Sequence, residues 1–161
     1  LSPYHFPFMD RVIYRIRNKV SKPERVGIFQ YSPFRKKWRA VFTTFDEKTQ
    51  TFSRKVRSSG VFALMRDVYP PKIRFYKPKS RLKKRVSFIT VRLSDKGKGL
   101  NDNSIRIRLN GSLITDEYDP DWSRVRIYDL RALRIGKNIL SVELADYAKN
   151  KTAKQFQFYL K

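Results

Sequence analysis

Hydrophobic and polar residues alternate with a period of two along much of the chain. In one clear run, Ile105, Ile107 and Leu109 alternate with Arg106 and Arg108. This alternation is typical of antiparallel strands that are buried on one side only. It predicts an all-β fold, with further strands of the second half at 124–128, 140–144 and 155–160.

The first half of the chain shows the same kind of pattern. Turn-forming segments "SPFRKK" (32–37) and "DEKTQ" (46–50) separate hydrophobic runs, which predicts two hairpins. The strands that we expect in this half lie at 12–18, 25–31, 37–45, 51–58 and 60–67.

Residues 123–133 are compatible with an amphipathic helix or with a strand and a loop. Val125 and Ile127 alternate with arginines, and this period of two favours a strand. The segment "LRALRIG" (130–136) is then a loop that leads into the next strand. Short strands separated by turns are typical of a β-sandwich.

The Pro70-Pro71 pair predicts a stiff junction between two modules. Proline donates no hydrogen bond to a sheet and restricts the residue before it. We therefore expect a small or incomplete β module at 1–68 and a β-sandwich at 69–161. Basic residues are abundant on both sides of the junction, so the charge is not confined to one tail.

Composition narrows the classes of partner. The 161 residues are 40% hydrophobic and 14% aromatic, which is enough for a folded core despite a net charge of +23. Such a charge attracts polyanions, which include nucleic acid, anionic lipid and acidic wall polymers.

The chain has no cysteine, which excludes a disulfide scaffold and a thiolate metal site. No hydrophobic run is long enough for a membrane span, and no signal peptide is visible. Because the chain starts at Leu1, we expect a fragment or a processed product.

The turns of the second module resemble those of bacterial Ig-like (fibronectin type III-like) domains. The resemblance rests on Asp95, Asn110-Gly111, Tyr118-Asp119-Pro120, Gly136-Lys137-Asn138 and the turn at 146–150. It implies an Ig-like sandwich at 69–161. Lys149 stands where the family usually has glycine, so either Lys149 or Asn150 is expected at positive φ, a conformation that asparagine tolerates better.

Residues 26–73 resemble the β-rich segment that precedes such domains in secreted bacterial proteins. The shared features are a hairpin with Trp38, the strand "GVFAL" (60–64) and the double-proline junction. This tandem is similar to the region C-terminal to lysostaphin-type (LytM-like) peptidoglycan metallopeptidase domains and to parts of cell-surface proteins. The resemblance implies a fold, and it is poorly informative about function.

We expect no catalysis by this chain and no bound cofactor. His5 is the single histidine, and the lysostaphin-type zinc site needs more than one. No G-x-S-x-G motif is present, and Ser59-Gly60 is predicted to be a turn. Acidic residues at predicted turns offer oxygen ligands for calcium, but turn formation explains them better. They are Asp95, Asp102, Asp116, Glu117, Asp119, Asp121 and Asp146.

A basic run follows the two prolines and has two interpretations. It is a nucleic-acid-binding arm with Phe75 and Tyr76 for stacking, or it is a strand (72–76), a loop (77–84) and a second strand (85–93). We favour the second interpretation, in which the cations cover a surface. The basic residues of the run are Lys72, Arg74, Lys77, Lys79, Arg81, Lys83, Lys84 and Arg85.

Two further pairs of arginines project from polar strand faces. Arg106 and Arg108 form one pair, and Arg124 and Arg126 form the other. If both strands lie in one sheet, the pairs form a single basic stripe, so we include all four as candidate anion- or partner-binding residues together with the basic run.

The absence of catalytic motifs and the charge predict a non-catalytic binding region, and the resemblance implies an accessory or scaffold region of a secreted bacterial cell-envelope protein. The parent would be a peptidoglycan metallopeptidase-like protein or a subunit of an envelope assembly, in the periplasm or at the cell surface. The region would dock on an anionic envelope polymer, a lipid headgroup or an acidic protein partner. The alternatives are a nucleic-acid-binding protein and a module whose partner adds a strand to an open sheet edge.

Overall fold

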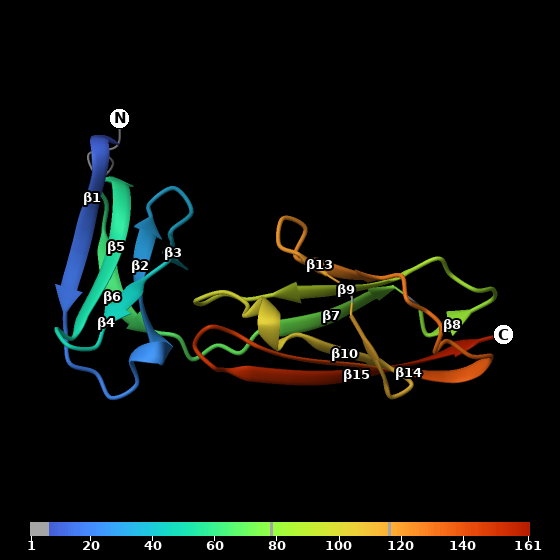
Figure 1. Cartoon of the computed structure of the whole chain (residues 1–161). Coiled ribbons are helices and arrows are strands. Elements are labelled where there is room, and N and C mark those ends of the chain that lie inside the picture. Colours follow the sequence, from blue (N-terminus) through green and yellow to red (C-terminus); the bar gives the residue numbers. More distant parts are fainter. Residues whose placement is uncertain (1–6, 78, 116) are drawn as a thin grey trace. The chain divides into compact units, whose positions relative to one another are not determined.

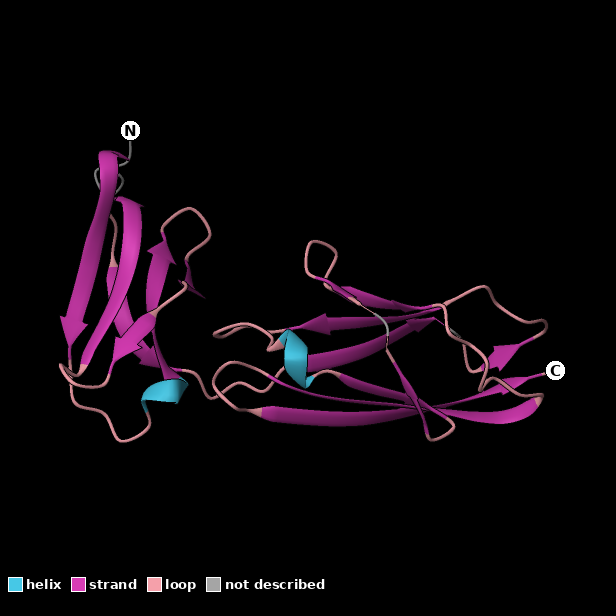
Figure 2. Ribbon diagram, in the orientation of Figure 1, coloured by secondary structure: helices cyan, strands magenta, loops and turns pink. Residues whose placement is uncertain are grey.

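A computed structural model describes residues 7–77, 79–115 and 117–161, and these residues form an all-β protein (Figure 2). Its helical segments are two short 3-10 turns, η1 (Pro23–Arg25) and η2 (Asp102–Ser104). In the described ranges, no helix has the length and apolar character needed to cross a membrane. The prediction of an all-β fold is therefore confirmed.

The chain divides into two compact units (Figure 1). The first unit contains residues 1–69, 96–98 and 147–149. The second contains residues 70–95, 99–146 and 150–161.

The first unit consists of two three-stranded antiparallel sheets, in the orders β1-β5-β4 and β3-β2-β6. Its small core contains Val26, Ile28 and Phe52, with Phe62 and Leu64 packed against them. The strands are β1 (Pro7–Arg17), β2 (Val26–Ser32), β3 (Lys37–Ala40), β4 (Thr44–Asp46), β5 (Thr51–Ser58) and β6 (Phe62–Arg66).

The single strand predicted at 37–45 is wrong, because the chain leaves one sheet and enters the other between Ala40 and Thr44. β3 pairs with β2, whereas β4 pairs with β5. At this crossing the Thr43 hydroxyl accepts a hydrogen bond from the Ile28 amide and donates one to the Val41 carbonyl. The two predicted hairpins, β2–β3 and β4–β5, are confirmed.

The second unit is a sandwich of two sheets in the orders β12-β13-β9-β7 and β11-β10-β14-β15-β8 (Figure 1). Immunoglobulin constant-type folds pair strands A, B, E and D in one sheet and C, F and G in the other. The strand order here corresponds to that arrangement, so the predicted Ig-like sandwich is confirmed. The strands are β7 (Lys72–Lys77), β8 (Arg81–Leu82), β9 (Ile89–Ser94), β10 (Arg106–Leu109), β11 (Ser112–Ile114), β12 (Tyr118–Asp119), β13 (Arg124–Ile127), β14 (Gly136–Ala145) and β15 (Lys151–Leu160).

The core of this sandwich is formed by the alternating hydrophobic residues of both sheets. Val91 and Val125 come from one sheet, and Leu140, Val142 and Phe158 come from the other, and all are fully buried. The strand interpretation of Val125 and Ile127 is therefore confirmed over a helix. On β9 and β13 the outward positions carry Thr90, Arg92, Arg124 and Arg126, the polar residues of the alternation.

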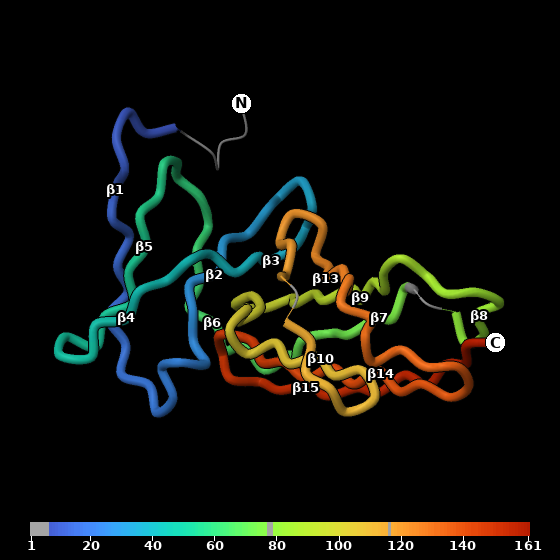
Figure 3. Tube along the Cα trace, turned by 45° about the vertical axis from the view of Figure 1, so that its right-hand side comes forward, coloured from blue at the N-terminus to red at the C-terminus, as the bar shows by residue number. Residues whose placement is uncertain are grey.

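The basic run after the prolines contains more structure than the predicted loop. Its segment Arg81–Leu82 forms β8, which pairs in parallel with Tyr159 and Leu160 of β15 (Figure 3). The run thus begins in one sheet and continues in the other. The strand predicted at 85–93 begins only at Ile89, as β9.

The predicted turns match the observed ones at two informative positions. Asn110 (φ 51°) and Gly111 (φ 88°) connect β10 to β11, in the left-handed conformation that an Asn-Gly hairpin requires. In the β14–β15 turn the residue at positive φ is Lys149 (φ 65°), which decides between the two residues considered for that role.

Candidate anion-binding face

A row of three arginines crosses the outward face of the four-stranded sheet of the second unit. Arg74 of β7 lies opposite Arg92 of β9, and Arg92 lies opposite Arg124 of β13. Side chains directly opposite one another on neighbouring strands have Cβ atoms about 5 Å apart. We call these three residues the arginine row.

Aromatic side chains flank the arginine row. The guanidinium of Arg124 lies 4.7 Å from the centre of the Trp122 ring, and that of Arg126 lies 5.7 Å from the Phe88 ring. The Phe88 ring is in turn 5.8 Å from that of Tyr128. Cations placed over ring faces in this way are attracted by the π-electrons. The arginine row, Tyr76, Phe88, Trp122, Arg126 and Tyr128 together form what we call the arginine–aromatic face.

A shallow hollow of about 210 Å³ lies on this face. It is lined by Tyr76, Thr90, Arg92, Trp122 and Arg124. Tyr76 and Trp122 are 71% and 63% exposed, so their rings are available for contact. Enclosed small-molecule sites usually have volumes of about 300–1,000 Å³. This hollow is smaller and open, which suits one ring or one anionic group of a longer ligand.

The arginine row has little local compensation of charge. Asp119 of β12 lies opposite Arg124, at 4.0 Å between Oδ2 and Nε, which is too long for a hydrogen bond. The other carboxylate oxygen of Asp119 accepts a hydrogen bond from the Trp122 amide. Burial raises the pKa of the neighbouring Tyr118 hydroxyl, so this phenol adds no negative charge near neutral pH. The face is therefore strongly positive.

The predicted basic run is divided between several elements. Lys72 and Arg74 project from β7, and Arg81 lies on β8 of the other sheet. Lys77 is the last residue of β7, and its side chain lies outside the described part of the structure. Lys79, Lys83, Lys84 and Arg85 are exposed residues outside the strands.

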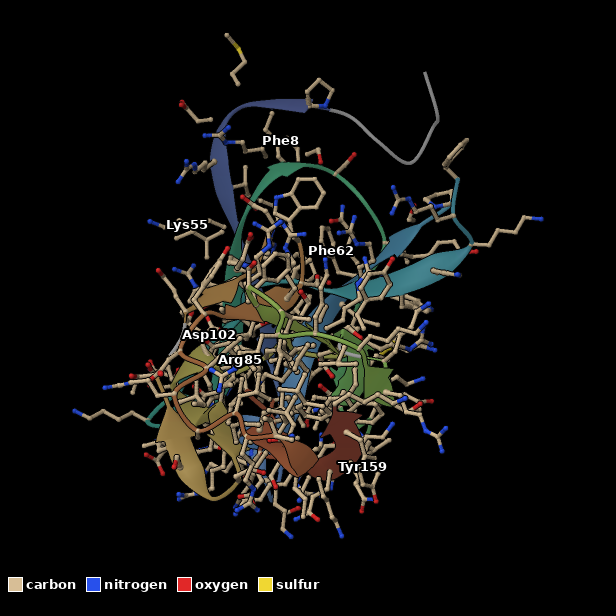
Figure 4. All side chains as sticks on the ribbon, turned by 90° about the vertical axis from the view of Figure 1, so that its right-hand side faces the viewer. Phe8, Lys55, Phe62, Arg85, Asp102 and Tyr159 are labelled. Carbon is tan, nitrogen blue, oxygen red and sulfur yellow. The ribbon has the colours of Figure 1, made fainter. Side chains whose placement is uncertain are left out.

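The two arginine pairs do not form a single stripe, because the condition that their strands lie in one sheet is not met. Arg106 and Arg108 lie on β10, which pairs with β11 and β14. Arg124 and Arg126 lie on β13, which pairs with β9 and β12. The two sheets share the core through their inward faces, so their outward faces point in opposite directions. Each pair therefore belongs to a separate basic surface, and Figure 4 shows nitrogen-tipped side chains projecting from the ribbon on many sides.

Arg92 and Trp122 are candidate site residues that the sequence interpretation missed. Arg92 follows the alternation of Ile89, Val91 and Leu93, so its outward direction was readable from the sequence. Its position between Arg74 and Arg124 was not readable, because it depends on which strands are neighbours. Trp122 lies in the β12–β13 turn and gave no periodic signal.

Two of the acidic residues considered as calcium ligands, Asp95 and Asp146, form hydrogen bonds within their own turns. The Asp146 carboxylate accepts hydrogen bonds from the backbone and side-chain nitrogens of Asn150, and that of Asp95 accepts one from the Gly99 amide. The Arg131 guanidinium donates two hydrogen bonds to Asp129 and lowers the pKa of that carboxyl group to about 2. Asp116 and His5, which entered the metal-site hypotheses, lie outside the described residues.

No family model matches the chain, and no curated protein matches it. A solved structure of the fibronectin(III)-like modules of CbhA from Clostridium thermocellum is similar over 97% of this chain and 88% of that one, with 14% identity and a TM-score of 0.44. The strand order of the second unit by itself defines the class, which is a basic all-β protein with an Ig-like sandwich.

Proposed function

We propose that this chain is a non-catalytic binding and scaffold region of a secreted bacterial cell-envelope protein. In this proposal the arginine–aromatic face docks on an anionic polymer of the envelope. The parent is a peptidoglycan metallopeptidase-like protein whose catalytic domain lies outside this chain, or a subunit of an envelope assembly. The observation that supports the proposal is the alignment of Arg74, Arg92 and Arg124 across three strands.

The chemistry of this face favours binding over catalysis. Guanidinium groups stay protonated in proteins, so they are poor general acids or bases but good partners for phosphate and carboxylate. Like charges directly opposite each other destabilise a sheet. A row of three is therefore a cost to the fold, which a bound polyanion would offset.

The aromatic residues suit a ligand with both rings and charges. Tyr76 and Trp122 are exposed on either side of Arg92 and line the same hollow. Aromatic rings bury large areas at small entropic cost, and their polar tips tolerate water. An anionic glycan chain would place its sugar rings on them and its charged groups on the arginine row.

A nucleic acid is the second candidate ligand, and the same arrangement supports it. Single-stranded nucleic acids bind to positive grooves in which aromatic side chains stack on successive bases. The face contains both elements. Nucleic-acid binding of this electrostatic kind weakens steeply as salt increases.

Co-sedimentation distinguishes the two ligands. The chain is mixed in parallel with purified anionic peptidoglycan sacculi, anionic vesicles and random-sequence DNA, across a salt series. We expect binding to sacculi that persists near physiological salt, with DNA binding lost there; binding to vesicles alone would identify a lipid headgroup as the ligand instead. DNA binding that persists while binding to the other two fails would establish the nucleic-acid alternative instead.

A matched pair of variants locates the binding surface. Arg92→Thr removes the centre of the arginine row, whereas Arg108→Thr removes an outward arginine of the opposite sheet. Loss of one charged hydrogen-bonding contact lowers affinity about tenfold. We expect that loss for Arg92→Thr and a change below about twofold for Arg108→Thr. Equal effects of both variants would contradict a defined binding face.

A further inference from the structure

The first unit contains an open groove with hydrophobic walls. Its volume is about 790 Å³, within the range of ligand-binding clefts. The groove is formed by β2, the β2–β3 turn, β3, the crossing segment after β3, one residue of β5 and the segment before β6. The side chains of Phe34 and Phe42 on its wall are 97% and 80% exposed, so large apolar surfaces face water.

An arginine occupies an inward position at this groove. On β5, Phe52 and Val56 are buried and point into the first unit, and Arg54 lies between them in the alternation. One terminal nitrogen of Arg54 donates a hydrogen bond to the Phe42 carbonyl at 3.2 Å. Its Nε is buried and has no hydrogen-bond partner among the described residues. Burial also lowers the pKa of this guanidinium.

A second hollow of about 310 Å³ adjoins the groove and shares Gln30 and Arg54 with it. The second hollow is also lined by Arg11, Lys55 and Arg57. None of the described residues that line either hollow is acidic. The combined surface is apolar at one end and basic at the other. Arg54 is its most buried cation, and no described residue that lines the surface offers Arg54 a carboxylate partner.

We propose that this groove binds a peptide segment of a partner protein. The segment places a carboxylate against Arg54 and apolar side chains against Phe34, Phe42 and Val61. A guanidinium binds a carboxylate through two parallel hydrogen bonds, which would satisfy the buried Nε. This site is on the first unit and does not depend on the arginine–aromatic face.

Two observations favour a peptide from another protein over other occupants. A second copy of this chain is disfavoured, because two chains of net charge +23 repel each other. β3 contributes Arg39 and Ala40 to the groove and lies at the edge of its sheet. An edge strand offers backbone donors and acceptors to an extended peptide, which a lipid would not use.

Affinity selection tests the proposal with three libraries of eight-residue peptides. The first library is rich in leucine and phenylalanine and carries one glutamate, with both ends blocked. The second has glutamine in place of glutamate. The third has glutamine and a free C-terminal carboxylate. Enrichment from the first library would identify a side-chain carboxylate as the ligand group, and enrichment from the third would identify a chain terminus.

Variants then test whether Arg54 contributes to binding, with the affinity for the selected peptides measured by fluorescence anisotropy. Arg54→Gln should weaken binding about 30-fold or more, as expected when one partner of a buried charge pair is removed. Arg66→Gln changes the same charge at an exposed position on β6 and should alter affinity less than about twofold. Thermal unfolding of both variants shows whether they are folded.

Two outcomes would overturn this inference. One is equal recovery from the glutamine library with blocked ends, which would make the carboxylate irrelevant. The other is no enrichment from any of the three libraries, which would leave the groove without the proposed ligand class. Anionic vesicles serve as an additional arm, and displacement of the peptide by vesicles in the wild type but not in Arg54→Gln would identify a lipid as the occupant instead.

Discussion

Asn138 is a fully buried polar residue whose side-chain hydrogen-bonding capacity is completely used. Its amide nitrogen donates to the carbonyls of Arg134 and Gly136. Its amide oxygen accepts from the Arg134 backbone nitrogen and from the side chain of Asn110. Asn110 in turn donates to the Ala132 carbonyl and accepts from the Ile139 amide. The two asparagines therefore connect the loop before β14 to the β10–β11 hairpin.

Replacement of Asn138 by alanine should strongly destabilise the second unit. The substitution leaves several polar groups of the neighbouring loop without partners, and each such loss costs about 1–3 kcal/mol. We expect a decrease of about 3 kcal/mol in the free energy of unfolding, measured by urea denaturation.

Asn103→Ala is the matched control, because Asn103 is exposed in η2. Its effect should stay within about 0.5 kcal/mol, as is usual for surface positions. Similar losses for the two variants would show that the hydrogen-bond network of Asn138 is not what stabilises this region.

At the residue scale the sequence predicted turn chemistry well and side-chain environments poorly. Asn110-Gly111 was recognisable as a hairpin turn because few other dipeptides adopt its backbone conformation. Arg54 was predicted to lie on a strand, but its inward direction follows only once Phe52 and Val56 are known to be the buried residues of that strand. A charged residue at an inward position of a strand, such as Arg54, is informative, because a folded protein rarely buries a cation without a partner for its charge.

The strands themselves were predicted from alternation, whereas their neighbours were not. Runs such as 105–109 and 124–127 have a local signal that does not depend on the rest of the chain. Pairing partners depend on contacts between distant segments, which one sequence does not reveal. The strand at 37–45 was predicted as continuous because this segment contains no glycine or proline to mark the crossing. In the structure the hydroxyl of Thr43 takes the place of a backbone partner there.

The arginine row has a consequence for the stability of its three strands. Removing the central charge relieves two like-charge contacts, each worth about 0.2–1 kcal/mol. Arg92→Thr should therefore raise the free energy of unfolding by about 0.5 kcal/mol while it weakens anion binding. Thermal unfolding at low salt measures the change.

Arg108→Thr again supplies the comparison. Arg108 pairs with the uncharged residues Leu113 and Ser141, so its removal relieves no repulsion. The increase in the free energy of unfolding caused by Arg92→Thr should be smaller at high salt, where exposed charges are screened. A loss of stability for Arg92→Thr at low salt would contradict the electrostatic account of the row.

At the scale of the whole molecule, a net charge of +23 on 161 residues opposes compaction. Added salt screens this repulsion, with a Debye length that falls from about 30 Å at 0.01 M to about 8 Å at 0.15 M. We expect the melting temperature to rise over this range of sodium chloride.

Potassium chloride is the control for this measurement. Screening depends on ionic strength, so the two salts should raise the melting temperature equally. A melting temperature that is constant or falls with ionic strength would mean that ion pairs outweigh the net repulsion in the folded chain.

The parallel pairing of β8 with β15 also matters when the second unit is stretched. The Tyr159 amide donates to the Ser80 carbonyl, and the Lys161 amide donates to the Leu82 carbonyl. These bonds join a segment that closely follows the start of the unit to the strand at its end. In parallel strands the bonds are evenly spaced along both partners. A pulling force applied through the two ends would therefore load these bonds together instead of breaking them one at a time. The pairing would then act as a mechanical clamp for the sandwich. The segment that forms this clamp was predicted from the sequence to be a basic loop.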